Sequence, residues 1–246
     1  MKPVLLVIAH GSRDPRHAAT VHALVRRVRS LRPDVRVETG FLDFNIPSVQ
    51  GVLESLAAEG VRDVVALPLL LTRAFHAKAD IPAVLRDAPP QLRIRQAEVL
   101  GPSPLLLSAL ERRLYEAGLT PADKSSTGVV LASAGSTDPE AIAVIADIAR
   151  EWRHTGWCAV RPAFASAALP RTEDAVRELR ALGCAKVAVV PYVLAPGFLP
   201  DRIARGAGEA DVLAGVLGPA PEVARVLLRR YDAAAARGLP RLTVSA

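Results

Sequence analysis

The sequence contains few of the residues that mark a disulfide-rich secreted protein or a membrane protein. Its two cysteines, Cys158 and Cys184, are too few for a disulfide framework and too far apart in the chain for a CxxC motif. We expect two buried thiols. No apolar stretch approaches the roughly 18 residues of a membrane span, and Met-Lys-Pro runs into the first apolar strand without a cleavage-type leader. The sequence therefore predicts a soluble, cytoplasmic protein without a membrane partner.

Aromatic residues are also scarce, at 4% of the chain, whereas the formal net charge is +6. A positive charge suits an anionic partner, which is a nucleic acid, a membrane surface or a polyacidic small molecule. The arginines are spread along the expected helices and are not interleaved with aromatic residues that could stack on bases. This distribution disfavours a nucleic acid, whereas the charge alone does not decide between the other two partners.

The glycine motifs of the common nucleotide-binding α/β enzymes are missing. The first strand is followed by neither GxGxxG nor GxxxxGK[ST], so the backbone cradles for dinucleotides and phosphates are not there. The GxSxG elbow of serine hydrolases is missing too. We therefore expect no ATP, NAD or flavin cofactor.

The chain contains an internal duplication. The pattern Gly-Ser-x-Asp-Pro begins at Gly11 and recurs at Gly135, an offset of 124 residues. Further along, Pro47 corresponds to Pro170 at an offset of 123. One residue of slippage over that length indicates a nearly intact repeat, so we predict two halves with the same fold.

Each half alternates short apolar runs with segments of helical periodicity, a pattern typical of βαβ units around a mostly parallel sheet. The sequence therefore predicts an α/β fold of two similar domains, residues 1–120 and 128–240, with a polar linker at 118–128. Asp14 and Pro15 are placed as the N-cap and first-turn proline of the first helix. The remaining expected elements are strands at 4–8, 35–41, 64–71, 92–99, 129–133, 158–164, 187–194 and 211–217, helices at 48–58, 81–86, 103–117, 138–152, 173–182, near 201 and at 222–236, and a tail from 237.

Candidate functional side chains follow three strands of the first half. In open α/β sheets, ligands bind beyond the carboxyl ends of the strands, where the connecting loops meet. These loops contain His10, Asp43 and His76. Imidazole binds iron, cobalt, nickel and zinc and can also accept a proton near neutral pH. Two histidines and a carboxylate at one end of the sheet therefore indicate a metal or acid–base site.

The duplication provides an internal control for these candidates. The turn residues are repeated in the second half, whereas His10 corresponds to Ala134, His76 to Leu199 and Asp43 to Ser166. We infer that the repeated residues build turns and that the unrepeated ones perform chemistry. Ser12, next to His10, is more typical of a turn hydroxyl than of a nucleophile.

Three segments of the first half form a recognisable combination. They are Ala9-His10-Gly11-Ser12-Arg13-Asp14-Pro15, then Phe41-Leu42-Asp43 with Pro47, then Pro68-Leu69-Leu70-Leu71 followed by His76 and Asp80-Ile81-Pro82. This combination resembles the sirohydrochlorin chelatases, which are class II chelatases of siroheme and cobalamin biosynthesis. The resemblance extends over nearly the whole chain, because that family includes long forms made of two fused halves.

The resemblance implies two chelatase-like domains that face each other across a cleft and hold a tetrapyrrole between them. Because two fused halves can form this cleft within one chain, we expect a monomer. The resemblance also implies an enzyme, a lyase that inserts Co²⁺ or Fe²⁺ as a substrate. The family's metal-site histidines fall on His10 and His76, and its accompanying acidic residue, usually a glutamate, falls on Asp43. Because aspartate is one methylene shorter, Asp43 either binds the metal, orients a histidine or accepts a proton.

A polyacidic tetrapyrrole also requires cationic contacts. The cationic candidates are Arg13, Arg73 and Lys78, and Ser12 is a fourth, uncharged candidate for substrate binding; all four lie in the loops that carry the histidines. Arg13 is the best of them, since a guanidinium can bind a carboxylate with two parallel hydrogen bonds. Two alternatives stay open. The protein could carry a metal or tetrapyrrole without turnover, or the turn around His10 could bind phosphate esters as in a phosphatase.

Overall fold

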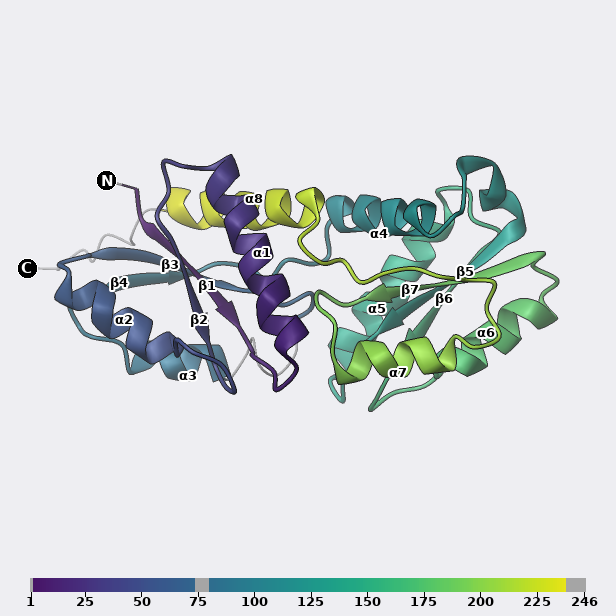
Figure 1. Ribbon diagram of the computed structural model, residues 1–246, viewed down its shortest axis with the longest axis horizontal. Helices are drawn as coiled ribbons and strands as arrows, with labels where there is room; N and C mark the ends of the chain where they lie inside the picture. Colours follow the sequence, from purple (N-terminus) through teal and green to yellow (C-terminus); the bar gives the residue numbers. More distant parts are fainter. Residues whose placement is uncertain (1, 74–79, 238–246) are drawn as a thin grey trace, which may run out of the picture.

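The computed structural model describes residues 2–73 and 80–237, which form two four-stranded sheets flanked by helices (Figure 1). The strand orders are β2-β1-β3-β4 in the first half and β6-β5-β7-β8 in the second, and every strand pair in them is parallel. The predicted α/β fold with duplicated halves is confirmed. The strands are β1 (Val4–Ala9), β2 (Val37–Phe41), β3 (Asp63–Pro68), β4 (Arg93–Gln96), β5 (Thr127–Ser133), β6 (Ala159–Phe164), β7 (Lys186–Tyr192) and β8 (Val212–Leu213).

The helices begin where the local sequence chemistry predicts. Asp14 caps α1 (Pro15–Leu31) by accepting a hydrogen bond from the backbone N–H of Arg16. Its repeat Asp138 caps α5 (Pro139–Arg153) in the same way. No helix in the described ranges is long and apolar enough to cross a bilayer. The other helices are α2 (Val49–Ala58), α3 (Ile81–Arg86), α4 (Pro104–Glu116), α6 (Thr172–Ala181), α7 (Phe198–Gly206), α8 (Pro221–Ala236) and the 3₁₀ helix η2 (Pro121–Ser126).

Two of the predicted strands are much shorter than expected. The sequence predicts strands over 92–99 and 211–217, whereas β4 has four residues and β8 has two. Both lie at a sheet edge, where a strand has one partner, and Gly215 interrupts the segment after β8. The apolar runs at these edges continue as irregular chain. Ala97 still donates to Ala66, and Leu217 donates to Val193.

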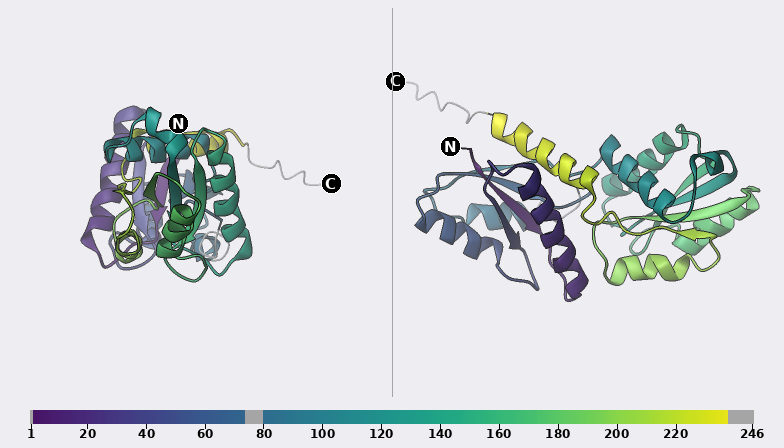
Figure 2. Two further views of the ribbon diagram at one scale, coloured as in Figure 1. Left: turned by 90° about the vertical axis from the view of Figure 1, so that its right-hand side faces the viewer. Right: turned by 45° about the horizontal axis from the view of Figure 1, so that its top comes forward.

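One hydrophobic core extends through both halves. This common core contains Leu24 of α1, Leu67 of β3, Leu110 of α4, Leu131 of β5 and Leu227 of α8, each fully buried. Smaller clusters fill the opposite faces of the sheets, under α2 and α3 in the first half and under α6 and α7 in the second. Helices flank the strands in the end-on view as well (Figure 2). The two sheets therefore share one continuous core on the side of α1, α4, α5 and α8.

The last helices of the two halves are exchanged. α4, which ends the first half in sequence, packs against β7 of the second sheet, and α8 returns to pack against β3, β4 and α1 of the first (Figures 1 and 2). The Tyr231 hydroxyl of α8 donates to the Pro3 carbonyl at 2.8 Å, and Arg112 of α4 pairs with Glu222 of α8 at 3.0 Å. Each sheet is thus covered by the C-terminal helix of the other half.

The expectation of two buried thiols is wrong for one of them. Cys184 is buried, but Cys158 is exposed, because it lies in the turn that precedes β6 at the end of the sheet. The two sulfur atoms are 3.7 Å apart and both cysteines are free. They lie at the amino-terminal ends of their strands, opposite the end where the histidines were expected.

Candidate functional site

A cavity of about 330 Å³ lies where the carboxyl ends of the central strands of the two sheets face each other. Each half contributes the loops that follow its first and third strands, in agreement with the rule that ligands bind at this end of parallel sheets. The walls of the cavity are mostly apolar, and among the described residues two histidines line it. The lining consists of Ala9, His10, His17, Leu69, Leu70, Leu71, Thr72, Ser133, Ala134, Gly135, Tyr192, Val193, Leu194, Ala195, Leu199 and Pro200.

His10 lies directly after β1 and lines this cavity. Its Nδ1 is 3.3 Å from the Gly11 carbonyl oxygen. The neutral tautomer with its proton on Nδ1 donates to this carbonyl and keeps the lone pair on Nε2, the arrangement typical of metal-binding histidines. The His10 side chain is half-buried at the cavity wall.

The loop after β1 is held against the loop after β2. The backbone N–H of Asp43 donates to the His10 carbonyl at 2.9 Å, and the N–H of Ser12 donates to the Asn45 side-chain oxygen at 2.8 Å. Gly11 has φ +96°, and a Cβ atom there would lie 1.9 Å from the Asp43 carbonyl oxygen. Only glycine allows the two loops to approach so closely.

The second half repeats this backbone without the functional side chains. Gly135 also has φ +96° and also leaves 1.9 Å between a hypothetical Cβ and a carbonyl oxygen, here that of Ser166. The N–H of Ser166 donates to Ala134, just as Asp43 donates to His10. The predicted pairings of His10 with Ala134 and of Asp43 with Ser166 are confirmed.

Ser12 performs the turn role that its repetition indicates. Its hydroxyl oxygen accepts a hydrogen bond from the N–H of Asp14 at 3.1 Å, and Ser136 accepts one from Asp138 at 3.0 Å in the second half. Because the repeat keeps this hydrogen bond, the fold alone accounts for the serine. A contact between Ser12 and a substrate stays a prediction.

Asp43 adjoins His10 through the backbone, while its side chain is exposed. One carboxylate oxygen accepts a hydrogen bond from the N–H of Phe44 at 2.8 Å, and the residue is not part of the cavity lining. Among residues 2–73 and 80–237, no three metal-binding side chains gather in one place. His76 and Lys78 lie outside the described residues, so the predicted site of His10, His76 and Asp43 stays a prediction.

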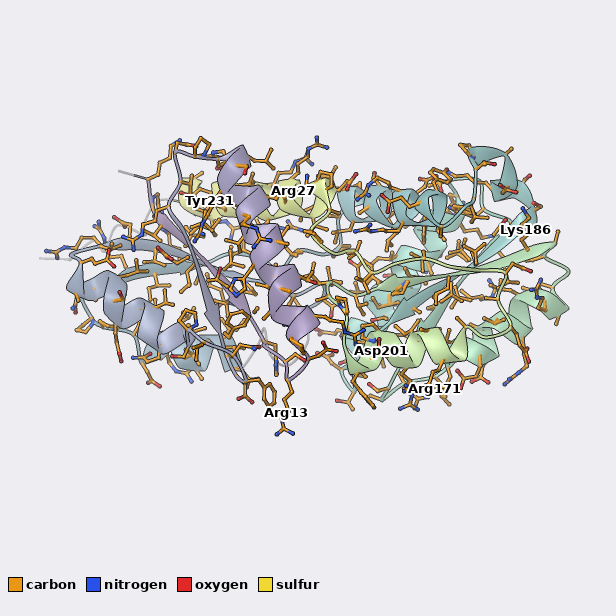
Figure 3. All side chains as sticks on the ribbon, viewed as in Figure 1. Arg13, Arg27, Arg171, Lys186, Asp201 and Tyr231 are labelled. Carbon is orange, nitrogen blue, oxygen red and sulfur yellow. The ribbon has the colours of Figure 1, made fainter. Side chains whose placement is uncertain are left out.

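The two predicted arginines differ in their surroundings. Arg13 is exposed, and its guanidinium carbon lies 5.2 Å from the centre of the Phe44 ring. Its side chain extends away from the molecule at the lower edge of the view in Figure 3. Arg73 is also exposed, but it pairs with Glu98 at 3.0 Å. Arg13 is therefore better placed to receive a carboxylate, because a substrate would have to displace Glu98 from Arg73.

His17 is a site residue that the sequence analysis missed. It lies in the first turn of α1, lines the cavity with His10, and its buried Nδ1 makes no hydrogen bond within the described structure. Burial, and next the nearby charge of His10, lower the pKa of His17. The helical periodicity could have revealed it, since His17 precedes the buried Val21 by four residues and so shares its face.

An ion pair joins the halves beside the cavity. Arg16 of α1 contacts Asp14 at 2.6 Å and Asp201 of α7 at 2.7 Å, so one guanidinium links both halves. Asp201 lies near the lower end of α1 in Figure 3, beside the cavity-lining residues that begin α7. The pair is about half-exposed and therefore contributes little stability. The pair nevertheless shows that α7 lies close to the first turn of α1, where His17 lies.

Comparisons with known proteins agree with this arrangement. A family model described as CbiX matches residues 4–117 and 128–234. The sirohydrochlorin cobaltochelatase of Priestia megaterium is 31% identical over 94% of this chain and 79% of that protein. The sirohydrochlorin ferrochelatase of Bacillus subtilis is 27% identical over 96% of this chain and 93% of that protein.

Solved structures show the same architecture. SirB from Bacillus subtilis with Fe³⁺ superimposes with a TM-score of 0.82 at 26% identity over 96% of both chains. The sirohydrochlorin chelatase SirB from Bacillus subtilis subspecies spizizenii in complex with cobalt gives a TM-score of 0.76 at 25% identity, again over 96% of both chains. The resemblance seen in the sequence is thereby confirmed, and the chain belongs to the CbiX family.

Proposed function

We propose that the protein is a sirohydrochlorin chelatase, a lyase that inserts Co²⁺ or Fe²⁺ into the tetrapyrrole. The observation that carries this proposal is the position of His10. It directly follows β1, a central strand of the first sheet, and lines a cavity between two duplicated halves, in a chain similar along nearly its whole length to a cobaltochelatase. A non-catalytic carrier would not need a proton acceptor, whereas the cavity contains a second imidazole, His17.

Metal insertion requires two tasks of the side chains. The divalent ion must exchange part of its water for protein ligands, and two pyrrole N–H protons must leave as the ion enters the macrocycle. In our proposal His10 and His76 hold the ion, and Asp43 orients one of them or accepts a proton. Burial lowers the pKa of His17, and in its neutral form this imidazole can accept a proton from the macrocycle. Holding the ion and the ring together provides the remaining acceleration by proximity.

The tetrapyrrole must extend beyond the cavity. About 330 Å³ is at the lower end of the range for small-molecule sites, so one edge of the macrocycle enters and the rest lies across the surrounding loops. Arg13 is the proposed carboxylate contact, supported by Ser12, Arg73 and Lys78. One chain supplies both walls, which supports a monomer as the active unit. The cytoplasmic location expected from the sequence remains part of this proposal.

An insertion assay tests the proposal. The visible spectrum of sirohydrochlorin is followed after addition of Co²⁺ or Fe²⁺ with the wild-type protein and with His10→Ala and His76→Ala. We expect both variants to lose most of the insertion rate while melting normally. Leu199→Ala is the matched control, because Leu199 corresponds to His76 in the second half and lines the same cavity. We expect it to alter packing only.

Three outcomes would contradict parts of the proposal. Stoichiometric binding of sirohydrochlorin without a metallated product would favour a carrier. Wild-type rates in both histidine variants would remove the proposed site. Affinity for phosphate esters that does not depend on His76 would favour the anion-binding alternative at the turn around His10.

A further inference from the structure

Phe44 is an aromatic side chain in an unusual backbone conformation. It lies in the loop between β2 and α2 with φ +60°, and 51% of it is exposed. A bulky residue in the left-handed region is uncommon and costs roughly 1–3 kcal/mol. Neither the backbone conformation nor burial explains a phenylalanine here, in a chain with only five of them. The position therefore requires an explanation other than the packing of the core.

Hydrogen bonds on both sides of Phe44 fix the loop that carries it. Its N–H donates to the Asp43 carboxylate at 2.8 Å, and Asp43 is itself bound to the His10 carbonyl. On the other side, the Asn45 side chain accepts the Ser12 N–H. The ring is therefore presented on a fixed loop, which reduces the entropy lost when a ligand binds.

The ring lies near two groups that the proposed reaction needs, His10 and Arg13. The Phe44 and His10 rings are stacked, with centroids 6.4 Å apart and planes inclined by 28°. The guanidinium of Arg13 lies 5.2 Å from the Phe44 centroid. A metal-binding imidazole, an aromatic face and an exposed cation thus occur side by side at the end of the first sheet. A planar, conjugated polycarboxylate matches this set, since it can stack on the ring while a carboxylate pairs with the cation.

We propose that Phe44 is the stacking platform for the tetrapyrrole, and that Arg13 pairs with a carboxylate at its rim. This inference rests on the proposed function and adds a binding residue to it. Phe44 itself takes no part in proton transfer or metal binding. It contacts the substrate and holds the plane of the macrocycle beside His10.

The second half supplies the control for this proposal. Ala167, the counterpart of Phe44, has φ +61° and lies between residues with the same backbone hydrogen bonds. The loop therefore forms with alanine at this position. Phe44→Ala should fold normally, and a change in its binding reports the missing ring and not a broken turn.

The experiment measures substrate binding and turnover separately. Phe44→Ala is expected to raise the Kd for metal-free sirohydrochlorin, and the KM, by roughly tenfold, the size of one lost stacking contact. Its Co²⁺ affinity, measured by calorimetry without the tetrapyrrole, should change less than threefold. Phe44→Trp should restore binding, and its added indole fluorescence should be quenched by bound sirohydrochlorin. Trp152 and Trp157 are buried in the second half and provide the background signal.

The possible results separate this proposal from the proposed function. Unchanged Kd and KM in Phe44→Ala, with no added quenching in Phe44→Trp, would overturn the platform alone. A second possible result is that the wild type binds sirohydrochlorin but inserts no metal, while Phe44→Ala no longer binds it. This result would support the stacking platform and contradict the proposed enzymatic activity. A wild-type protein that does not bind sirohydrochlorin would overturn both.

Discussion

Gly11 and Gly135 are equivalent positions, so the same destabilising substitution can be made in either half. Both have φ +96°, and at both a Cβ would lie 1.9 Å from a backbone carbonyl oxygen. Replacement by alanine forces a residue with a side chain into the left-handed region, which costs about 1–3 kcal/mol. In a protein of this size, 1 kcal/mol lowers the melting temperature by about 2–4 °C. Gly11→Ala and Gly135→Ala should therefore each melt at least about 2–12 °C below the wild type, because the contact with the carbonyl oxygen adds to this cost.

Their effects on insertion should differ, because different residues precede the two glycines. Relief of the contact at Gly11 must move either His10 or the loop that carries Asp43, and a displacement of about 1 Å at a reacting group costs on the order of 100-fold in rate. At Gly135 the neighbours are Ala134 and Ser166, which carry no chemistry in our proposal. Because Gly135 still lines the cavity, a smaller loss is expected there, about tenfold or less.

The test combines calorimetric melting with Co²⁺ insertion, measured at a temperature at which both variants are fully folded. Equal loss of insertion in the two variants would refute the localisation of the chemistry in the first half. An unchanged melting temperature in either variant would refute the steric argument. A variant with two alanines should show the sum of the two shifts in unfolding free energy, because the sites have no partner in common.

Three further predictions follow from the packing and the charges. His17→Leu should raise the free energy of unfolding by about 1 kcal/mol, since it removes a buried unpaired nitrogen, while it lowers insertion. Burial lowers the pKa of His17, so the wild type loses stability relative to this variant as the pH falls below about 6.5; a difference that stays constant between pH 8 and pH 5 in urea melts would contradict this. Tyr231→Ala should lower the free energy of unfolding by about 3–5 kcal/mol. Amide hydrogen-exchange measurements should show that protection is lost first in β1. Earlier loss of protection in the second sheet would contradict the packing of α8 against the first half. Arg13→Ala should raise the KM for sirohydrochlorin more than Arg73→Ala does, and more at low than at high ionic strength; equal effects would contradict the role of the Arg73–Glu98 pair.

The local features of the fold could be predicted from the sequence because local chemistry determines them. Asp14 and Asp138 cap helices through hydrogen bonds to residues two positions away, so the Asp-Pro pair is sufficient to place both helix starts. Buried parallel strands appear as continuous apolar runs. The edge strands were overestimated for the same reason, since an apolar run does not reveal whether a strand has one neighbour or two.

The residues around His10 were harder to identify because their importance depends on contacts distant in sequence. His17 is an unremarkable first-turn residue until the cavity beside it is known. Phe44 adjoins a predicted site residue, but its left-handed conformation and its position close to His10 and Arg13 depend on the packing of two loops. One signal was available for both. His17 is a histidine on the apolar face of a helix, and Phe44 is an aromatic residue that aligns with Ala167 in the repeat. Each is an exception to the pattern of the residues around it.

The exchange of α4 and α8 could not be read from the sequence, and it explains how the site stays assembled. Both helices have an apolar face of the same kind, so periodicity shows that each covers a sheet but not which one. The extents of the duplication, residues 1–120 and 128–240, therefore remain our proposal for the repeated units, while the packing crosses between them.

Because each sheet is covered by a helix from the other half, opening the cleft by separating the halves would expose the common core. Exposure of a shared core is far more costly than the hinge motion of two independent domains. We infer that the halves stay closed during turnover and that the tetrapyrrole enters from the surface at the strand ends. Such a rigid cleft suits insertion chemistry, since the macrocycle and the metal ion must meet in one fixed geometry. The duplication then supplies two walls, of which only one needs to keep the imidazoles, and Ala134 and Leu199 can occupy the other.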